Sequence, residues 1–552
     1  MKINILYVLI PFFLFACNDK VAVAPEVKKE IPFVWEAANV YFLLTDRFNN
    51  GDTSNDLNFE RNLETGKLRG FKGGDIKGIT QKIKEGYFTD LGINAIWMTP
   101  VVEQIHGGTD EGTGLSYGYH GYWASDWTSI DPNFGSKQDL HELVEVAHEN
   151  GIRVLLDAVI NHTGPVTEKD PVWPEEWVRT GPKCEYKNYE STVTCTLVEN
   201  LPDMKTDSND SVELPEQLVE KWKKEGRYEE ELEELNAFFE RTGYPRAPRF
   251  YIMKWLTDYI TEFGIDGYRV DTVKHTEAYV WQEFKKECDF AFSEFKKNNS
   301  GKVLDDNNFY LVGEVYNYGI STGKDFDYGD QKVDFYSKAF NGLINFELKY
   351  NAAQQSFEET SKNFSRILNS ELKGYGVLNY LTSHDDGQPY DPNREKPFEA
   401  AVRLLLSPGA SQVYYGDESS RSLAIEGSEG DATLRSFMNW EAIENDTRTQ
   451  AILNHWQKLG KFRANHPAIG AGRHKMISET PYVFSRTYKT NDFEDEVVVG
   501  LNLIKGNKTL NVSKVFENGV MLKDAYSGTK VEVKQGMVSI NSDFEIVLLE
   551  RL

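Results

Sequence analysis

The chain has 552 residues, of which 61 are Lys or Arg and 86 are Asp or Glu, so its formal net charge is -25. This charge argues against nucleic acid or an anionic membrane surface as a partner, because both are bound through clustered Lys and Arg. It fits a protein that acts on a neutral or cationic ligand, and the length allows two or three domains with large cores.

The N-terminus is predicted to be a targeting segment. Lys2 precedes an apolar run, residues 5–16, that is too short to span a bilayer. A small residue directly before Cys17 resembles a bacterial lipobox, which predicts a lipidated cysteine; a plain signal peptide is the alternative. We assign residues 1–17 to a lipoprotein signal peptide and residues 18–32 to a tether. We expect an exported monomer anchored by lipid to a bacterial membrane, with the outer membrane or cell surface favoured, facing the periplasm or the exterior.

After residue 32, short apolar runs typical of strands alternate with helical patterns. The predicted strands lie within residues 40–45, 95–98, 153–160, 267–275, 309–315, 343–346, 376–381 and 412–415. The predicted helices are residues 79–91, 140–150, 250–263, 278–297 and 400–406. Eight strands with helices between them predict an α/β fold, a (β/α)8 TIM barrel.

Two segments depart from this alternation. Residues 162–248, after the third strand, have no such rhythm and are predicted to form an inserted, loop-rich domain, within which the charged residues 214–241 favour amphipathic helix. Residues 467–552 hold short β runs without helices between them, which predict a C-terminal antiparallel β-domain. The barrel is therefore assigned to residues 33–161 and 249–466.

Three cysteines follow Cys17. Cys184 and Cys195 are close in sequence in a loop region of an exported protein, which predicts a disulfide between them. Cys288 lies in a helical pattern and is predicted to be a buried free thiol.

The stretch of residues 267–275, GYRVDTVKH, carries the first candidate catalytic group. Asp271 is expected at the carboxyl end of its strand, where barrels place catalytic residues, and Arg269 on the same face. An arginine next to an aspartate favours the ionised form of its carboxyl group. The alternative is an ordinary Arg–Asp ion pair at a strand end.

Two further acids, Glu314 and Asp385, stand at or just after the ends of other predicted strands. The strand ends of a barrel meet at one rim, so these acids and Asp271 are expected to share a pocket. Glycoside hydrolysis needs one ionised carboxylate and one protonated acid, and a separation of roughly 5–5.5 Å gives retention of configuration through a covalent intermediate. The like charge of Asp271 is expected to raise the pKa of Glu314 and keep it protonated.

Four segments resemble the short signatures of the α-amylase family, glycoside hydrolase family thirteen. They are DAVINH at residues 157–162, GYRVDTVKH at residues 267–275, Gly313-Glu314, and Ser383-His384-Asp385. The resemblance runs from about residue 40 to at least residue 467. Within the family the chain looks most like the periplasmic α-amylases of Gram-negative bacteria, because it contains YFLLTDRFNNGD, EQIHGG, YGYHGYW, YYGDESSR and FRANHPAIGAG.

The resemblance implies a role for each acid. Asp271 would be the nucleophile, Glu314 the general acid and then base, and Asp385 a group that binds sugar hydroxyls in the transition state. Arg269 would orient Asp271. The implied sugar contacts are His162, His384, His120, Lys274 and Tyr122, the last as a stacking platform.

The resemblance also implies a structural calcium between the barrel and the inserted domain, and calcium takes six to eight oxygen ligands. Asn161, Asp203 and the backbone carbonyl of His275 would be ligands, with a carbonyl near Val193 as a fourth, braced by the predicted disulfide. The alternative for Asn161 is a satisfied turn residue.

A second calcium is predicted in the first loop, which resembles the N-terminal calcium loop of cyclodextrin-forming relatives. Its candidate ligands are Asn50, Asp52, Asn55, Asp56, Gly73 and Asp75. Closely spaced oxygen ligands with Gly turns suit calcium; the alternative is an Asx-rich turn held by its own side chains. Chloride is not expected as a cofactor, because Ser383 stands where chloride-activated relatives have an asparagine.

The function that this resemblance implies is retaining endo-hydrolysis of α-1,4 bonds in starch, glycogen or maltodextrins. Two alternatives remain open. One is a 4-α-glucanotransferase or cyclodextrin-forming transglycosylase on the same scaffold, and the other is a non-catalytic glucan-binding lipoprotein.

Overall fold

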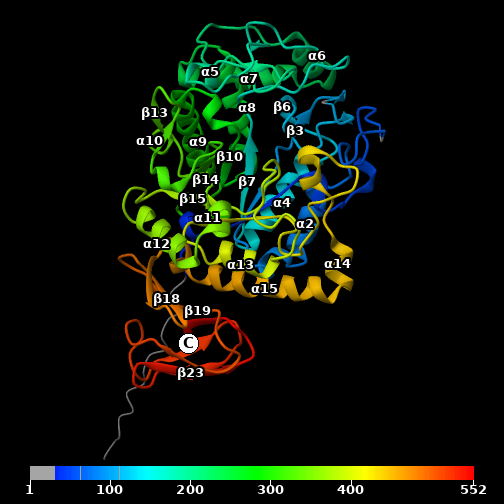
Figure 1. Cartoon of the computed structure of the whole chain (residues 1–552). Coiled ribbons are helices and arrows are strands. Elements are labelled where there is room, and N and C mark those ends of the chain that lie inside the picture. Colours follow the sequence, from blue (N-terminus) through cyan, green and yellow to red (C-terminus); the bar gives the residue numbers. More distant parts are fainter. Residues whose placement is uncertain (1–30, 63, 111) are drawn as a thin grey trace, which may run out of the picture.

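The computed structural model describes residues 31–62, 64–110 and 112–552 (Figure 1). The predicted signal peptide, Cys17 and residues 18–30 of the predicted tether lie outside the described residues. Within the described part of the chain, no helix is both long enough and apolar enough to cross a bilayer.

Eight parallel strands close into a barrel in the order β1-β16-β15-β14-β11-β10-β7-β2. Their bounds are β1 Asn39–Leu43, β2 Ala95–Met98, β7 Arg153–Ala158, β10 Gly267–Val270, β11 Tyr310–Gly313, β14 Gly342–Asn345, β15 Gly376–Asn379 and β16 Ala410–Tyr414. Every residue of these strands is buried, because the helices cover the outside and side chains fill the inside. The predicted barrel and all eight predicted strands are confirmed.

Helices cover the outside of this barrel. The bounds are α1 Thr45–Phe48, α2 Ile76–Lys84, α3 Tyr87–Asp90, α4 Lys137–Glu149, α8 Pro248–Phe263, α9 Ala278–Asn298, α10 Phe335–Lys338, α11 Leu348–Gln354, α12 Phe357–Leu368, α13 Pro397–Leu405, α14 Trp440–Asn445, α15 Thr447–Asn465 and α16 Pro467–Ala471. The helix predicted at residues 79–91 is in fact two helices, because Gly86 takes a left-handed conformation with φ 80° between α2 and α3. Helix α4 begins before residue 140 because Ser136 and Asp139 form a capping box.

Small antiparallel pairs sit in the loops of the barrel, and the sequence patterns did not predict them. They are β3 Val102–Gln104 with β6 Ala124–Ile130, β4 Thr109–Asp110 with β5 Leu115–Ser116, and β12 Asp325–Asp327 with β13 Lys332–Asp334. Five of these strands have only two or three residues, too few to show a periodic pattern, and the seven residues of β6, ASDWTSI, do not alternate between apolar and polar.

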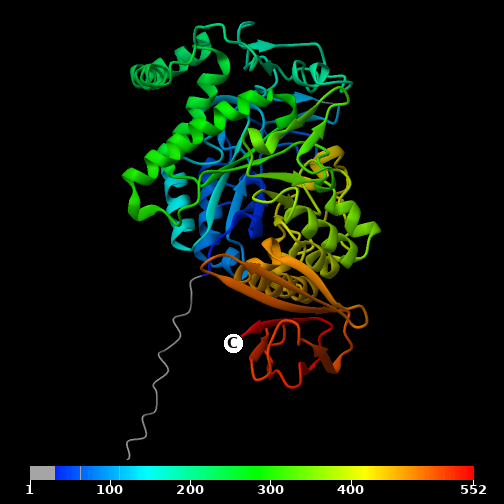
Figure 2. The same cartoon turned by 90° about the vertical axis from the view of Figure 1, so that its left-hand side faces the viewer.

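The segment after β7 forms a layer at the end of the molecule opposite the C-terminal sheet (Figures 1 and 2). Its elements are β8 Val178–Arg179, α5 Glu190–Val193, β9 Asp203–Met204, α6 Glu216–Glu225 and α7 Tyr228–Thr242. The predicted disulfide is present, with Cys184 and Cys195 joined at 2.01 Å, and Cys288 is a buried free cysteine as predicted. Trp222 packs edge-on against Trp255 of α8 at 6.2 Å between ring centroids, which ties this layer to the barrel.

The C-terminal region is antiparallel β-structure, as predicted. One sheet has the order β17-β18-β19-β24-β21-β22, and β20 pairs with β23. The bounds are β17 Arg473–Ser478, β18 Tyr482–Lys489, β19 Glu494–Leu501, β20 Gly506–Asn511, β21 Met521–Asp524, β22 Lys530–Glu532, β23 Met537–Ser542 and β24 Val547–Arg551. A core of its own, which includes Val498, Leu522 and Leu549, lies inside this region.

A histidine ion-pair cluster joins the barrel to the C-terminal sheet. His466 follows α15, and its Nδ1 lies 2.8 Å from Asp495 Oδ1 while its Nε2 lies 2.9 Å from Glu550 Oε2. Burial alone would lower the pKa of His466, but the hydrogen bonds and charges of the two carboxylates outweigh it and raise the pKa to about 9. The imidazolium therefore holds two strands of the sheet, β19 and β24, to the end of α15.

This cluster makes the stability depend on pH. Because the folded-state pKa of about 9 exceeds the ordinary 6.5, the stabilisation is complete below pH 6.5 and is lost as the pH rises through 9. We expect His466→Gln to lower the free energy of unfolding by up to roughly 3 kcal/mol at pH 6 and by much less at pH 9.5. Thermal melts at the two pH values measure this. His141→Gln, at a histidine that is 43% exposed, is the control, and an equal loss at both pH values would contradict the prediction.

Candidate active site

Asp271 and Glu314 follow directly after the neighbouring barrel strands β10 and β11. The two strands are in register, with Val270 opposite Gly313. Backbone hydrogen bonds continue past the strand ends, from Glu314 N to Val270 O at 2.9 Å and from Val273 N to Glu314 O at 3.0 Å. The two carboxyl groups are thus held side by side at the carboxyl-end rim of the barrel, as the sequence predicted.

Arg269 is the centre of this rim. Its Nη1 donates to Asp271 Oδ1 at 2.7 Å and to both oxygens of Asp157, at 2.9 and 3.0 Å. Its Nη2 lies 2.9 Å from Glu314 Oε1. The arginine is 1% exposed, so one buried guanidinium contacts three carboxyl groups from three adjacent strands.

Asp157 is a site residue that sequence reasoning missed, although it opens the quoted DAVINH motif. It lies opposite Arg269 in the register of β7 and β10. Trp97 Nε1 and Tyr122 Oη donate to its Oδ2, at 3.1 and 2.9 Å. Burial raises the pKa of Asp157 to about 7, while the charge of Arg269 limits the rise. Asp157 could have been identified only from the pairing of β7 with β10, which the sequence does not show.

The environment of Glu314 favours its protonated form. Burial raises its pKa well above the usual value, the charges of Asp271 and Asp385 add to the rise, and Arg269 opposes it. Thr272 N donates to Glu314 Oε2 at 3.0 Å, which fixes the carboxyl group in place. A protonated carboxyl group beside a second, arginine-paired carboxylate is the arrangement that acid-assisted cleavage requires.

Asp385 lies beyond β15 and is more open than the other two acids. Its side chain is 32% exposed, and Ser383 Oγ donates to its Oδ1 at 3.2 Å. The next residue, Asp386, anchors this segment, because its Oδ2 accepts from Lys349 of α11 and from Tyr380 Oη. No sequence pattern pointed to Lys349, since the pairing depends on how α11 packs.

Histidine and tyrosine side chains line the rim beside these acids. The rings of Tyr122 and His384 stack at 5.2 Å with an interplanar angle of 23°. His162 Nε2 donates to Tyr122 O at 3.2 Å, and Tyr122 N donates to His120 Nδ1 at 3.1 Å. Burial lowers the pKa of all three histidines, so they are neutral at pH 7. Buried His162 Nδ1 has no partner among the described residues, which leaves it available to a ligand.

Lys274 marks another flank of the rim. Its Nζ lies 5.4 Å from the ring centre of Tyr186 and 5.2 Å from that of Tyr316. Burial lowers the pKa of Lys274. The two rings are 52% and 41% exposed, so they offer open aromatic faces on this side. Sequence reasoning did not single out either tyrosine, because neither stands in a recognised motif.

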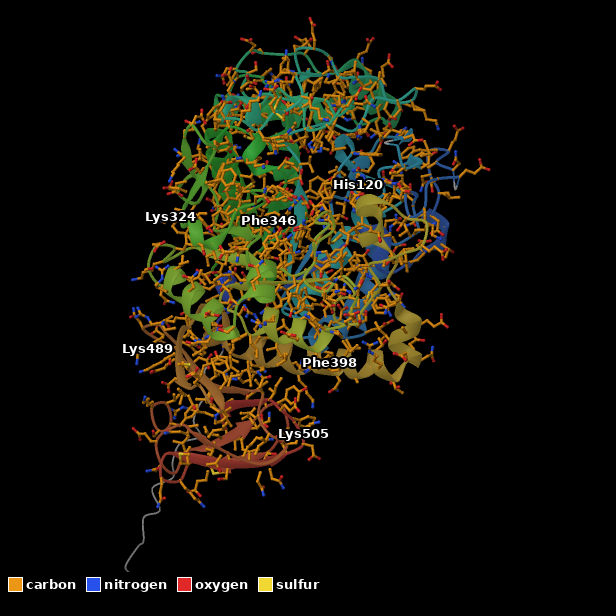
Figure 3. The ribbon with its side chains drawn as sticks, viewed as in Figure 1. His120, Lys324, Phe346, Phe398, Lys489 and Lys505 are labelled. Carbon is orange, nitrogen blue, oxygen red and sulfur yellow. A yellow bond between two sulfur atoms is a disulfide. The ribbon has the colours of Figure 1, made fainter. Side chains whose placement is uncertain are left out.

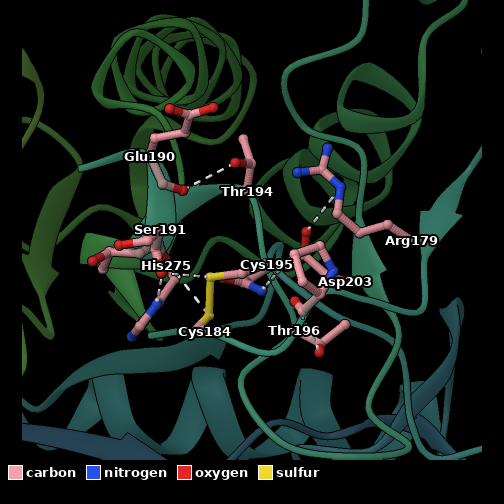
Figure 4. The surroundings of a disulfide bond; sticks show 12 residues. Arg179, Cys184, Glu190, Ser191, Thr194, Cys195, Thr196, Asp203 and His275 are labelled. Carbon is pink, nitrogen blue, oxygen red and sulfur yellow. Dashed lines mark hydrogen bonds and ion pairs between the residues drawn. A yellow bond between two sulfur atoms is a disulfide. The ribbon is translucent and has the colours of Figure 1, made fainter. Parts of the chain in front are cut away.

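The first predicted metal site contains an unpartnered buried oxygen. Asn161 Nδ2 donates to Asp203 Oδ1 at 2.7 Å, while Asn161 Oδ1 is buried without a partner among the described residues. His275 Nδ1 donates to Thr192 O at 2.9 Å, which brings His275 against α5, where Val193 is located. Figure 4 shows His275 close to the disulfide and Asp203 close to Arg179. An orphaned amide oxygen beside a carboxylate fits a cation such as calcium.

The first loop holds the second predicted set. Asp75 caps α2 and accepts from Asp52 N at 2.8 Å and Gly78 N at 2.6 Å. Asn50 Nδ2 donates to Asp56 Oδ1 at 2.8 Å. The structure brings the predicted residues together, and two of them carry buried oxygens without a partner among the described residues, Asn50 Oδ1 and Asn55 Oδ1.

Two details qualify this second set. Asp52 pairs with Lys77 at 2.6 Å, so that carboxylate already has a partner. At Gly73, with φ 86°, a Cβ atom would lie 2.5 Å from Asn50 Nδ2 and 2.6 Å from Asp56 Oδ1. Only glycine fits this approach. Among the described residues no group of three or more His, Cys, Asp or Glu could hold a metal, so both predicted sets depend on amide and backbone oxygens.

Comparisons with known proteins agree with this geometry. The sequence model of "Alpha amylase, catalytic domain" matches residues 42–468. The chain is 34% identical over 532 residues to the periplasmic α-amylase of Escherichia coli (strain K12), covering 86% of this chain and 73% of that one. It is 28% identical to a cyclomaltodextrin glucanotransferase of Geobacillus stearothermophilus, covering 84% of this chain and 59% of that one.

Among solved structures, an Anoxybacillus α-amylase is similar in fold, with a TM-score of 0.65. The two are 23% identical, and the match covers 94% of this chain and 99% of that one.

We expect the contacts of Arg269 with three carboxyl groups to contribute strongly to the free energy of unfolding. Arg269→Met would leave buried Asp157 without its counter-ion, and removing one partner of a buried pair costs roughly 3–5 kcal/mol. Because lower pH protonates the unpaired carboxylates, the loss should shrink from pH 7 to pH 5. Urea unfolding at both pH values measures it. As a control, Arg551→Met removes a pair in which the arginine is 53% exposed and should cost less than about 1 kcal/mol; similar losses for the two variants would count against this interpretation.

Proposed function

This chain belongs to the α-amylase family, and we propose that it hydrolyses internal α-1,4-glucosidic bonds of starch, glycogen or maltodextrins with retention of configuration. The family match and the periplasmic relative make it a glycoside hydrolase. The observation that carries the more specific proposal is that Asp271 is paired with Arg269 and lies next to a buried Glu314 whose pKa is raised.

In the proposed reaction, Asp271 attacks the anomeric carbon while Glu314 gives its proton to the departing glycosidic oxygen. The C–O bond breaks, and a glycosyl ester forms on Asp271. Glu314, now ionised, takes a proton from water, whose oxygen attacks the same carbon and releases Asp271. The hydrogen bond from Arg269 to Asp271 Oδ1 at 2.7 Å keeps this carboxylate oriented, and Asp385 would accept hydrogen bonds from sugar hydroxyls.

The rim supplies the proposed sugar contacts. The ring of Tyr122 would stack on the face of the sugar at the cleaved bond. His162 and His384 would hydrogen-bond the hydroxyls of this sugar as neutral imidazoles. His120 would contact the sugar next to Tyr122. Lys274 would contact the neighbouring glucose.

Transglycosylation is the competing reaction, and one observation favours it. The exposed rings of Tyr186 and Tyr316 beside Lys274 could hold an acceptor sugar where water would otherwise attack. One relative is named a cyclomaltodextrin glucanotransferase. A non-catalytic glucan-binding role is weaker, because the three acids are all present and converge on one rim.

For the metal, we propose calcium held by Asn161, Asp203 and the carbonyls of His275 and Val193, and a second ion held by the first loop. The ion would supply charge that offsets the burial of Asp203, whose pKa burial raises to about 8. Asn161 Oδ1 without a partner among the described residues supports this site. Because His275 lies four residues after Asp271, one of the proposed ligands belongs to the same segment as the proposed nucleophile.

The periplasmic location of the Escherichia coli relative supports export of this chain. We propose a lipid anchor at Cys17 and a monomeric enzyme that does not require chloride.

Two variants test the mechanism. Glu314→Gln and Asp271→Asn should each lower kcat on maltodextrin by at least about 10²–10⁴-fold while the circular dichroism spectrum stays unchanged. In the native enzyme, the raised pKa of Glu314 should keep activity at pH values above the usual titration range of a glutamate, and activity should fall as this acid loses its proton. Glu347→Gln, at a half-buried acid just after β14 that accepts a hydrogen bond from Ser321 Oγ, is the control. Near-normal turnover in either variant would refute the mechanism, and cyclic or longer products would show transfer.

Removal of calcium gives a separate test. A chelator should lower the melting temperature of the native enzyme, because a ligand that binds only the folded state stabilises it, and readdition of calcium should restore it. Asn161→Ala should reduce this chelator effect to the part that the ion proposed in the first loop contributes. Activity should fall at temperatures where the chelated enzyme is still folded, since His275 shares its segment with Asp271. Full activity of the chelated, folded enzyme would contradict this coupling.

A further inference from the structure

A groove of about 1020 Å³ lies between the barrel and the C-terminal sheet. Its walls come from α12 and α13, from α15, and from the ends and loops of the C-terminal strands. Six aromatic rings line it: Phe357, Phe398, His455, Tyr482, Tyr526 and Phe544. In Figure 3, Phe398 and Lys505 of this groove lie toward the C-terminal sheet, whereas His120 of the rim lies in the upper part of the molecule. The groove shares no residue with the rim described above.

Four of these rings form a continuous, fixed run across the domain boundary. Ring centroids are 5.2 Å apart for Phe398 and His455, 5.7 Å for His455 and Tyr526, and 5.0 Å for Tyr526 and Phe544. His455 Nε2 donates to Phe398 O at 3.0 Å, so its Nδ1 accepts from Tyr526 Oη at 2.7 Å. Burial lowers the pKa of His455 to about 4. The imidazole is therefore neutral, and the run carries no charge of its own.

The two rings at the ends of the run are partly exposed, and Lys458 Nζ lies over the Phe544 ring, 4.7 Å from its centre. Phe398 is 44% exposed and Phe544 is 39% exposed, although each packs against a more buried ring. A single exposed aromatic needs no explanation. Here two exposed aromatic rings are held in place at the ends of a fixed run within a groove. They form a pre-organised platform, because little side-chain entropy is lost when a ligand stacks on them.

The polar groups around this platform are mostly acidic. Glu399, Asp543 and Glu545 line the groove, with Arg403 and Lys505 among them. Excess negative charge disfavours nucleic acid, an anionic lipid surface or an acidic glycan. Carboxylates that accept and cations that donate hydrogen bonds suit the hydroxyls of a neutral sugar, whose C–H faces stack on aromatic rings.

We propose that this groove binds a segment of neutral α-glucan, at a site separate from the cleavage rim. This proposal rests on the proposed function, which makes a glucan polymer the substrate. A polymer bound at the rim extends beyond the residues of the rim and can reach a second site. Binding at a second site on the same chain raises the effective concentration of polymer at the rim. A short oligosaccharide gains nothing from it, so the groove acts on long substrates only.

The test measures retention of the protein in native gels that contain glycogen. The parent is Glu314→Gln, so that the polymer stays intact, and Phe398→Ala and Phe544→Ala are added singly and together. Loss of two stacking contacts should weaken glycogen binding by about tenfold or more. Phe290→Ala is the matched control, because this ring of α9 is 43% exposed and lies outside the groove. Phe398→Trp keeps an aromatic face and should retain the parent mobility.

The same changes in the active enzyme separate this proposal from the proposed function. Phe398→Ala with Phe544→Ala should lower kcat/KM on glycogen by several-fold and leave kcat/KM on maltoheptaose unchanged. The groove proposal is overturned if Phe398→Ala with Phe544→Ala leaves the mobility in the glycogen gel unchanged. It is also overturned if Phe398→Trp weakens glycogen binding as much as Phe398→Ala does. No hydrolysis of maltoheptaose by the unmodified enzyme would instead overturn the proposed function, and the binding measurement would still decide the groove.

Discussion

One buried arginine holds the functional end of this protein together. Arg269 contacts Asp157, Asp271 and Glu314 from β7, β10 and β11, and three carboxyl groups so close together could not be buried without a cation between them. The barrel makes this possible, because parallel neighbouring strands bring residues distant in sequence to one height along the barrel axis. Arg269 and Asp157 are direct register partners. The surroundings of two of these acids differ: Asp271 takes the short hydrogen bond from Arg269, whereas burial and the charges of Asp271 and Asp385 raise the pKa of Glu314 against the opposing effect of Arg269.

The loops beyond the strand ends carry the rest of the site. Thr272 takes a left-handed conformation with φ 49°, after which η3, Val273–His275, turns the chain against α5. This turn links β10 to the layer that carries the disulfide. On the other side, the pair of Lys349 and Asp386 fixes the segment of Asp385 through α11. Each acid is thus positioned by an element outside its own strand.

The C-terminal sheet is coupled to the barrel by charge as well as by packing. His466 links it to α15 through Asp495 and Glu550, and the fixed aromatic run of the groove crosses the same boundary through His455 and Tyr526. The two histidines differ in charge because their partners differ. Two carboxylates hold His466 as a cation, whereas a hydroxyl and a backbone carbonyl leave His455 neutral. Both histidines thus make side-chain hydrogen bonds from the barrel to the C-terminal sheet or its loops.

The sequence by itself determined the barrel, the C-terminal β-structure, the disulfide and the acids at the rim. Each of these features is indicated by a local sequence pattern: a buried apolar run, a close pair of cysteines or a short motif after a strand. The tertiary structure decided the rest. Asp157 and Lys349 join the site through strand register and helix packing. Tyr186 and Tyr316 flank Lys274, and the groove lies where the barrel meets the C-terminal sheet. These features depend on contacts between residues far apart in the chain, whose pairing no local pattern records; for Arg269 and Asp157 the separation is 112 residues.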